Sequence, residues 1–166
     1  NHRQSARSDS FNRFLTANSR LIVTPDKVFE FGEYPYPANS LHPGQHEFRK
    51  HFYPTVGDLR PGTEEFMCAQ IIDSLNEVDC WVRNLEGQPK LSFWLQTSRW
   101  RFYPDFVCRL KDGRYLVVEY KGGHLYTDAE EKRTVGELWE RRSEGRCLFI
   151  MPTNREYGVI QAKIRM

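Results

Sequence analysis

Apolar residues recur along this 166-residue chain with two different spacings, which predict helices and strands in alternation. In the stretch 63–78 the spacing is that of a helix, because apolar side chains stand three, four and seven residues apart. The apolar face of this predicted helix is formed by Cys68, Ile71, Ile72 and Leu75. Thr63 precedes it as a plausible N-cap, and two glutamates occupy its first turn.

Short apolar and aromatic runs follow this helix and predict strands of a meander. They cover residues 81–85, 91–95, 102–110 and 115–121, and the last two are expected to form a hairpin. A second helix is expected from Asp128 to about Arg142, with Val135, Leu138 and Trp139 on its buried side. The run 146–151 is nearly all apolar and predicts a strand buried on both faces. This order predicts an α/β fold whose central sheet is flanked by helices on both faces.

The first 60 residues have a different character. Short apolar pieces at 21–23 and 28–31 are followed by several prolines from residue 35 onward, which indicates a loop-rich region with room for a hairpin. We therefore expect residues 1–60 to be an irregular N-terminal extension and residues 61–166 to be the folded domain. The chain starts with Asn1, which favours a fragment of a longer polypeptide or a trimmed chain.

Composition adds few constraints. With 39% hydrophobic residues the chain can build one core, and a net charge of +2 neither demands nor excludes a nucleic-acid partner. The four cysteines stand far apart without a C-x-x-C pair, which favours reduced thiols. No run approaches the length of a membrane span and no signal-peptide core is present, so a cytoplasmic location is expected.

Two charges at the end of an apolar strand are the most informative feature. Glu119 and Lys121 close the run Tyr115-Leu116-Val117-Val118. An unpaired buried ion is costly or becomes neutral by a shift of its pKa, so an apolar strand end does not accept charge freely. A divalent cation would remove that penalty.

The loop before this strand decides whether a second carboxylate can join. If Asp112 and Gly113 form a two-residue turn, Asp105 falls opposite Tyr120 and points away from Glu119. If residues 111–113 form a three-residue loop with Gly113 left-handed, Asp105 lies directly opposite Glu119. Both turns tolerate Asp-Gly, but only the second register allows a shared site, and that register is our prediction.

In that register the carboxylates of Asp105 and Glu119 are cross-strand neighbours, and Lys121 shares their face. Mg²⁺ commonly uses one or two carboxylates together with water and substrate phosphate, so it suits this pair. Lys121 would then position the attacking water or stabilise charge on the phosphate. A third carboxylate is expected from the first helix, where Glu65 is favoured at the edge of the apolar face and Glu64 is the alternative.

Basic residues near this strand are candidates for DNA contact. Arg99 and Arg101 alternate with aromatic residues in a pattern compatible with binding the DNA backbone. Lys132 and Arg133 lie on the helix after the site and can also reach phosphate. Core packing of the aromatics and solvation of the helix charges are the competing interpretations.

Pro104-Asp105 and Glu119-Tyr120-Lys121 resemble the two halves of the PD-(D/E)xK nuclease signature. A closer resemblance covers residues 48–153, over half of the chain. It includes the strings HFYPTVGDL, WVRNLE, SFWLQTSRWRFYPDF, DGRYLVVEYKGGHL, EEKRTVGELW and RCLFIMPT. In these strings the chain is similar to the C-terminal endonuclease domain of the restriction subunit of type III restriction-modification enzymes.

This resemblance implies a restriction-endonuclease-like core with a central mixed sheet, and Mg²⁺-dependent hydrolysis of double-stranded DNA, with Mn²⁺ as a substitute. It implies metal ligation by Asp105, Glu119 and the backbone carbonyl of Tyr120, with Lys121 as the catalytic lysine and Glu65 as the helix glutamate. It also implies a helicase-like motor in the same polypeptide and a methyltransferase subunit as partners. ATP would be used only by that motor, which has no motif in this chain.

The main rival is a non-catalytic DNA-binding or assembly module that keeps the nuclease fold. The complete set of Asp105, Glu119 and Lys121 argues against it, since a module that only binds DNA needs no metal-holding carboxylates.

Overall fold

A computed structural model describes residues 13, 29–33, 36–44, 46–123 and 127–166. Its helices and strands are, in chain order, α2 (Glu64–Ser74), β1 (Val78–Arg83), β2 (Leu95–Gln96), β3 (Arg101–Phe102), β4 (Phe106–Leu110), β5 (Tyr115–Val118), α3 (Thr127–Arg142), β6 (Cys147–Ile150) and α4 (Gly158–Ile164). The order of a helix, a run of strands, a second helix and a further strand agrees with the hydrophobic spacing.

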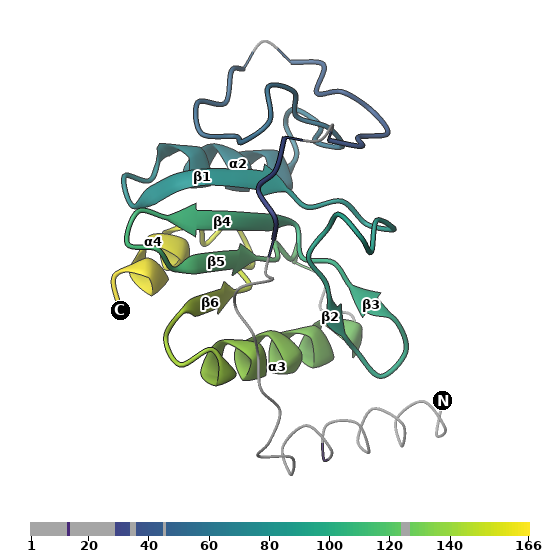
Figure 1. The fold of residues 1–166 in the computed structure, drawn as a ribbon, viewed down its shortest axis with the longest axis vertical. Coiled ribbons are helices and arrows are strands. Elements are labelled where there is room, and N and C mark those ends of the chain that lie inside the picture. Colours follow the sequence, from purple (N-terminus) through teal and green to yellow (C-terminus); the bar gives the residue numbers. More distant parts are fainter. Residues whose placement is uncertain (1–12, 14–28, 34–35, 45, 124–126) are drawn as a thin grey trace.

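The central sheet has the strand order β1-β4-β5-β6 (Figure 1). Neighbours β1, β4 and β5 run antiparallel, whereas β6 pairs parallel to β5 after the crossover through α3. A parallel neighbour requires such a crossover, and here it is a helix. The sheet is therefore mixed and the fold is α/β, as predicted.

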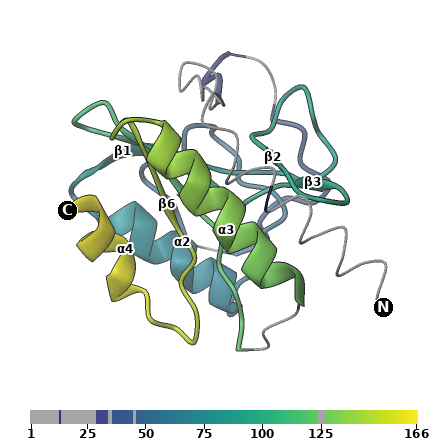
Figure 2. The same ribbon diagram turned by 90° about the horizontal axis from the view of Figure 1, so that it is seen from below.

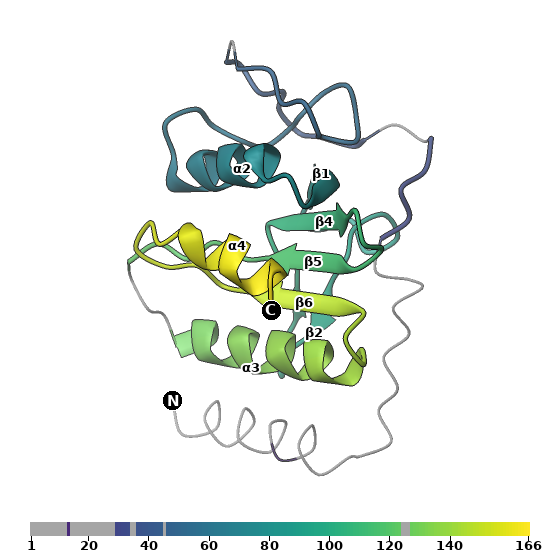
Figure 3. The same ribbon diagram turned by 90° about the vertical axis from the view of Figure 1, so that its left-hand side faces the viewer.

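Each face of the sheet carries its own hydrophobic core. The first core joins α2 and α4 to alternate strand residues such as Trp81, Phe106 and Leu116. The second joins Trp139 of α3 to the residues that point the other way, among them Val107. Figure 3 shows α2 and α4 on the same side of the strands, and Figure 2 shows α3 alongside β6. The prediction that helices cover both faces is confirmed.

Helix α2 begins where the sequence predicts and ends earlier. The Thr63 hydroxyl accepts a hydrogen bond from the Phe66 N–H at 3.2 Å, which satisfies one of the free donors of the first turn. The helix stops at Ser74 because Leu75 turns into an extended conformation and Val78 already belongs to β1. The prediction of a helix reaching residue 78 was therefore too long.

The hairpin of β4 and β5 has the predicted register. Phe106 pairs with Val118 and Arg109 with Tyr115, and the Leu110 N–H donates to the Arg114 carbonyl at 2.8 Å. The loop is Lys111-Asp112-Gly113, and Gly113 has a φ of +89°. Residues with a Cβ atom rarely adopt a positive φ of this size, so glycine suits this position. The three-residue loop with a left-handed glycine is confirmed.

The prediction of long strands at 91–95 and 102–110 is wrong. Residues there form a separate two-stranded sheet of β2 and β3, and Pro104 interrupts the second run before β4. Buried Asn84 replaces the missing strand ladder: its side-chain amide donates to the carbonyls of Phe93 and Pro104, and its oxygen accepts from the Phe93 N–H. A proline cannot donate to a ladder, which explains the break.

Gly136 of α3 lets the Phe149 ring of β6 pack directly against the helix backbone. A Cβ built at this position would lie 2.4 Å from the Phe149 ring, well inside van der Waals contact. The helix starts at Thr127, one residue before the expected Asp128, which lies in its first turn. Gly136 thus sets the distance between α3 and the sheet.

The predicted hairpin at 21–31 lies almost entirely outside the described residues. Described parts of 29–60 cover the sheet rather than stand apart: Phe48 and Val56 pack on the first core, while Phe31 and Phe52 pack on the second. The boundary at residue 60 stays a prediction. Helix α4, which carries buried Ile160 and Ile164, was not expected from the sequence.

All four cysteines are buried thiols, in agreement with the sequence. In the part of the chain that the structure describes, no helix combines the length and apolarity required to cross a membrane.

Candidate functional site

Asp105 and Glu119 lie side by side where β4 begins and β5 ends. The ladder between β4 and β5 ends at Phe106 and Val118, and one further step in the same register brings Asp105 opposite Glu119. The Asp105 carboxylate also crosses to the other strand, where its Oδ2 accepts the backbone N–H of Tyr120 at 2.7 Å. The neighbouring strands hold both backbones: Asn84 donates to the Asp105 carbonyl, and the Glu119 N–H donates to Ile150.

The pKa of the Glu119 carboxyl group is strongly raised. Its side chain is only 7% exposed, and its pKa is raised to about 8 by burial and by the negative charge of Asp105. The charges of Lys132 and Lys121 act in the opposite direction without cancelling these effects. A carboxyl group with this pKa holds a proton at neutral pH, so the protein tolerates Glu119 best when its charge is removed or neutralised.

Lys132 reaches Glu119 from α3. Its Nζ lies 3.2 Å from Glu119 Oε1 and 3.7 Å from Asp128 Oδ2, and it sits 4.9 Å from the centre of the Phe102 ring. Burial lowers the pKa of Lys132, but the charge and hydrogen bond of Glu119 together with the charges of Asp128 and Asp105 outweigh burial, and the net shift is upward. The lysine is therefore a charged partner of Glu119. Its predicted contact with DNA phosphate stays a prediction.

Lys121 follows the pair on the same face of the sheet. Its backbone N–H donates to the Pro152 carbonyl at 3.0 Å, and it bridges to Thr153, so the loop after β6 holds this residue in an extended conformation. Its charge lowers the pKa of Glu119. Asp105, Glu119 and Lys121 thus belong to the same strand end, and the role of Lys121 stays a prediction.

Helix α2 contributes the third carboxylate, and the structure separates its two glutamates. Glu65 Oε2 lies 2.8 Å from an Arg83 nitrogen, and the charge of Asp105 adds to burial in raising the pKa of Glu65. Glu64 instead accepts from the Tyr120 hydroxyl and from Arg155. Glu65 is thus the helix glutamate that faces Asp105.

Arg83 is a member of this cluster that the sequence interpretation missed. It ends β1, and its two terminal nitrogens lie 2.7 Å from Asp105 Oδ1 and 2.8 Å from Glu65 Oε2. A charge at the end of the apolar run Cys80-Trp81-Val82 is the same signal that marks Glu119. Applying that criterion to basic residues as well as acidic ones would have found it.

The cluster is open to solvent on the α2 side. Glu65 is partly exposed and lines a surface hollow of about 330 Å³. The other residues that line this hollow are Ser40, Asp58, Arg60 and Thr63. A polar ligand can therefore approach Glu65 from this side, whereas Asp105 and Glu119 do not line the hollow.

The remaining predicted DNA contacts lie elsewhere. Arg99 and Arg101 are exposed on the connection and strand of the small sheet, where Arg101 stacks on Trp94 at 4.7 Å and Arg99 on Trp100 at 5.7 Å. Trp100 is itself 52% exposed. A surface that alternates guanidinium groups with indoles is compatible with nucleic acid, and these contacts stay predictions.

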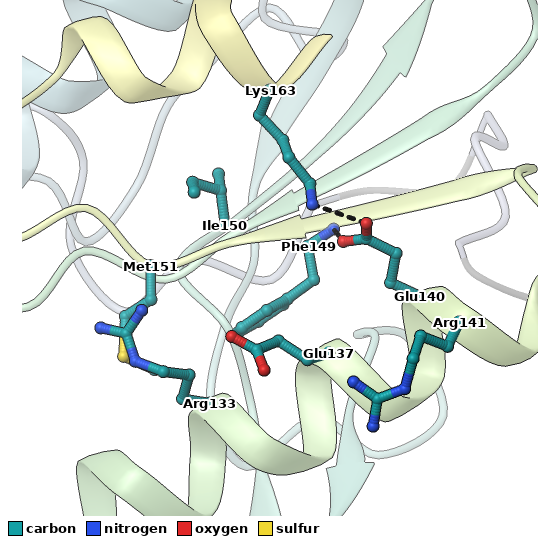
Figure 4. Close-up of a pocket in the computed structure, with 8 residues that line it drawn as sticks. All are labelled: Arg133, Glu137, Glu140, Arg141, Phe149, Ile150, Met151 and Lys163. Carbon is teal, nitrogen blue, oxygen red and sulfur yellow. Dashed lines mark hydrogen bonds and ion pairs between the residues drawn. The ribbon is translucent and has the colours of Figure 1, made fainter. Parts of the chain in front are cut away.

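Arg133 lies on a different part of the surface from Lys132. It lines a hollow of about 260 Å³ between α3, β6 and α4 (Figure 4). The hollow is closed at one end by Glu140, which binds Lys163 at 2.6 Å and the Phe149 N–H at 2.8 Å. None of the predicted catalytic residues lines it, so the structure does not bring Arg133 together with Asp105.

The fit of a metal ion depends on the Asp105 and Glu119 pair. Among the described residues, no group of three or more His, Cys, Asp or Glu side chains is arranged to hold a metal ion. The predicted ligand set is smaller, since it contains two carboxylates and the Tyr120 carbonyl. Burial and mutual repulsion of the two carboxylates are the conditions that a nearby dication relieves, so these donors fit Mg²⁺ chemically.

No protein-family model, curated protein or solved structure matches this chain. The residues and their geometry are therefore the basis of the functional argument.

Proposed function

We propose that this chain is the DNA-cleavage domain of a type III restriction enzyme, a Mg²⁺-dependent endonuclease with a PD-(D/E)xK core. One observation carries the proposal. Asp105 and Glu119 face each other at a strand end beside Lys121, and Glu119 is buried with its pKa raised to about 8. Perturbed acids of this kind concentrate at catalytic sites, because a structural role alone would not favour two adjacent carboxylates.

Asp105, Glu119 and the Tyr120 carbonyl would hold the ion. When bound, Mg²⁺ would acidify a water molecule and neutralise charge on the scissile phosphate, and Mn²⁺ would substitute for it. The Tyr120 N–H fixes the Asp105 carboxylate through its 2.7 Å hydrogen bond, so this ligand needs no reordering. Preorganised ligands reduce the cost of binding.

The two lysines have different tasks. Lys121 lies on the open strand end, where its ammonium would orient the attacking water and stabilise negative charge on phosphorus. Lys132 reaches Glu119 from α3, with its Nζ 3.2 Å from the carboxyl group, and is 16% exposed. It acts as a positioning residue. Each site would cleave one strand by direct attack of water.

Double-stranded DNA is the proposed substrate, and Arg99 and Arg101 are its proposed backbone contacts, with Arg133 a more remote one. The domain would work in the cytoplasm behind a helicase-like motor of the same polypeptide and with a methyltransferase subunit. ATP use and sequence recognition would belong to those parts.

One observation favours the rival function of a DNA-binding or assembly module. Each of the three carboxylates already has a cation of the protein beside it. Arg83 forms ion pairs with Glu65 and Asp105, and Lys132 forms one with Glu119. A cluster neutralised in this way can be stable without a metal. The two functions differ in whether the carboxylates bind a divalent ion.

Replacement of Lys121 by alanine tests the nuclease. In the assembly with motor and methyltransferase subunits, ATP and Mg²⁺, Lys121→Ala should abolish DNA cleavage while DNA-stimulated ATP hydrolysis continues. Lys111→Ala, on the exposed hairpin loop, is the matched control and should cleave normally. Cleavage at the wild-type rate by Lys121→Ala would reject the assignment and favour the binding module.

A further inference from the structure

Arg83 is the one buried charge of the cluster that the proposed chemistry does not use. Its side chain is 12% exposed, and its guanidinium bridges Glu65 on α2 to Asp105 ahead of β4. The two carboxylates come from segments 40 residues apart in sequence, so the bridge is a tertiary contact rather than a local one.

The rest of the side chain is fixed as well. The guanidinium carbon lies 5.2 Å from the centre of the Phe106 ring, and the backbone of Arg83 donates to His51 and accepts from the Tyr36 hydroxyl. Within the described chain the buried Nε has no hydrogen-bond partner, so the hydrogen bonds of the guanidinium come from its terminal fork. Arg83 is held where its fork meets the two carboxylates.

The charge of Arg83 is permanent. Burial disfavours it, but the charges of Asp105 and Glu65 outweigh burial and raise the pKa of the guanidinium further. A divalent ion that approached the same pair of carboxylates would meet a fixed positive charge in a partly desolvated setting, where repulsion is strong.

Asp105 would consequently be shared between two cations once the proposed ion is bound. On one side it faces Glu119, which is the proposed Mg²⁺ position. On the other side it shares Arg83 with Glu65. Two-metal hydrolytic sites use a similar arrangement, in which two nearby cations clamp the substrate phosphate between them.

From this arrangement we infer that Arg83 takes the place of a second metal ion, so that the site binds a single divalent cation. The inference rests on the proposed nuclease function. Arg83 is a positioning residue: it holds Asp105 and Glu65 and supplies the positive charge that a second ion would bring. Glu65 then forms an ion pair with Arg83 and is not a ligand of the single metal ion.

Counting bound Mn²⁺ tests the inference without a cleavage assay. The chain is titrated with Mn²⁺ in the presence of a short DNA duplex, and free Mn²⁺ is measured by electron paramagnetic resonance. The wild type should bind one ion. Arg83→Gln should bind a second ion, and adding Glu65→Gln to that variant should remove the second ion again. The control variant Arg109→Gln removes an exposed ion pair of the same type and should bind one ion, as the wild type does.

Glu65→Gln alone keeps the test decisive if Arg83→Gln fails to fold. Glu65 is 43% exposed, so the change is tolerable, and the variant should bind one ion with unchanged affinity. Loss of that ion would overturn the inference, because Glu65 would then be a ligand.

Two ions on the wild type, or one ion with unchanged affinity on folded Arg83→Gln, would also overturn the inference and leave the nuclease proposal standing. No bound Mn²⁺ on any variant would instead reject the nuclease proposal, and the inference would fall with it.

Discussion

Two Arg–Asp ion pairs cross from β1 to β4, one at each end of the same pair of strands. Arg109 lies 2.8 Å from Asp79, and Arg83 lies 2.7 Å from Asp105. The distances are almost equal, but the first pair is 41% and 46% exposed and the second 12% and 14%. Water screens the first pair and is largely excluded from the second.

The difference shows that ion-pair geometry alone does not define a site. An exposed pair of this kind contributes at most about 1 kcal/mol. The buried pair adds a third charge, Glu65, and adjoins a fourth, Glu119, whose pKa responds to Asp105. Burial and the convergence of several charges are what distinguish the functional end of the strand pair from the structural end.

The largest difference in cleavage rate is expected from removing one negative charge at each end of the β1–β4 strand pair. Asp105→Asn should lower DNA cleavage by at least about 10²–10³-fold, the cost of losing one charge that stabilises a transition state. The amide oxygen can still accept the Tyr120 N–H, so the fold should persist. Asp79→Asn should leave the rate of cleavage unchanged, and equal effects of the two changes would contradict the assignment.

Removing the arginines should separate the two ends in stability. Arg83→Met leaves Asp105 buried without its cation and should lower the free energy of unfolding by about 3–5 kcal/mol. Arg109→Met should cost no more than about 1 kcal/mol. Urea denaturation in the absence of divalent ions measures both. Similar losses would mean that exposure does not govern the strength of these pairs.

A pH-dependent comparison extends the contrast to Glu119. The native state keeps a proton on Glu119 up to about pH 8, whereas the unfolded chain loses it near the ordinary value of 4.5. This group therefore contributes stability that falls as the pH rises between these values, by about 1.4 kcal/mol per pH unit, and is constant above about 8.

Glu119→Gln should remove that contribution, so its stability relative to the wild type should increase across the same pH window. The variant should be inactive as a nuclease. Thermal unfolding over a pH series measures the effect, with Glu130→Gln on the exposed side of α3 as the control. A constant difference between Glu119→Gln and the wild type over the whole series would show that the pKa of Glu119 is not raised.

The smallest effect is expected at the hairpin loop near Arg109. Gly113→Ala forces a side chain into a φ of +89° and should cost about 1–2 kcal/mol. A Cβ at this position meets nothing within 4 Å, so the cost is purely conformational. Metal affinity should not change, as measured by Mn²⁺ titration. A large change would show that the loop and the carboxylates are coupled beyond the register.

The parts of the site that local chemistry determines were predictable. The turn residues left two registers open, the need for two carboxylates on one face selected the observed one, and helical periodicity favoured Glu65. The contact of Lys132 with Glu119 was not predictable, because it depends on the close approach of α3 through Gly136 and Phe149. Pro104 signalled the break between β3 and β4, although the strand was predicted through it.

The hairpin loop has a consequence for how this protein can diverge. Substitutions among Lys111, Asp112 and Gly113 alter stability by small amounts, whereas a change in their number shifts the pairing of every residue in the two strands. Loss of a single residue there would turn Asp105 away from Glu119 although the acidic and basic residues of the site stayed intact in the gene. Related chains should therefore vary in the composition of this loop and keep its length, and a chain with a shorter loop should have lost the activity even if its acidic residues remain.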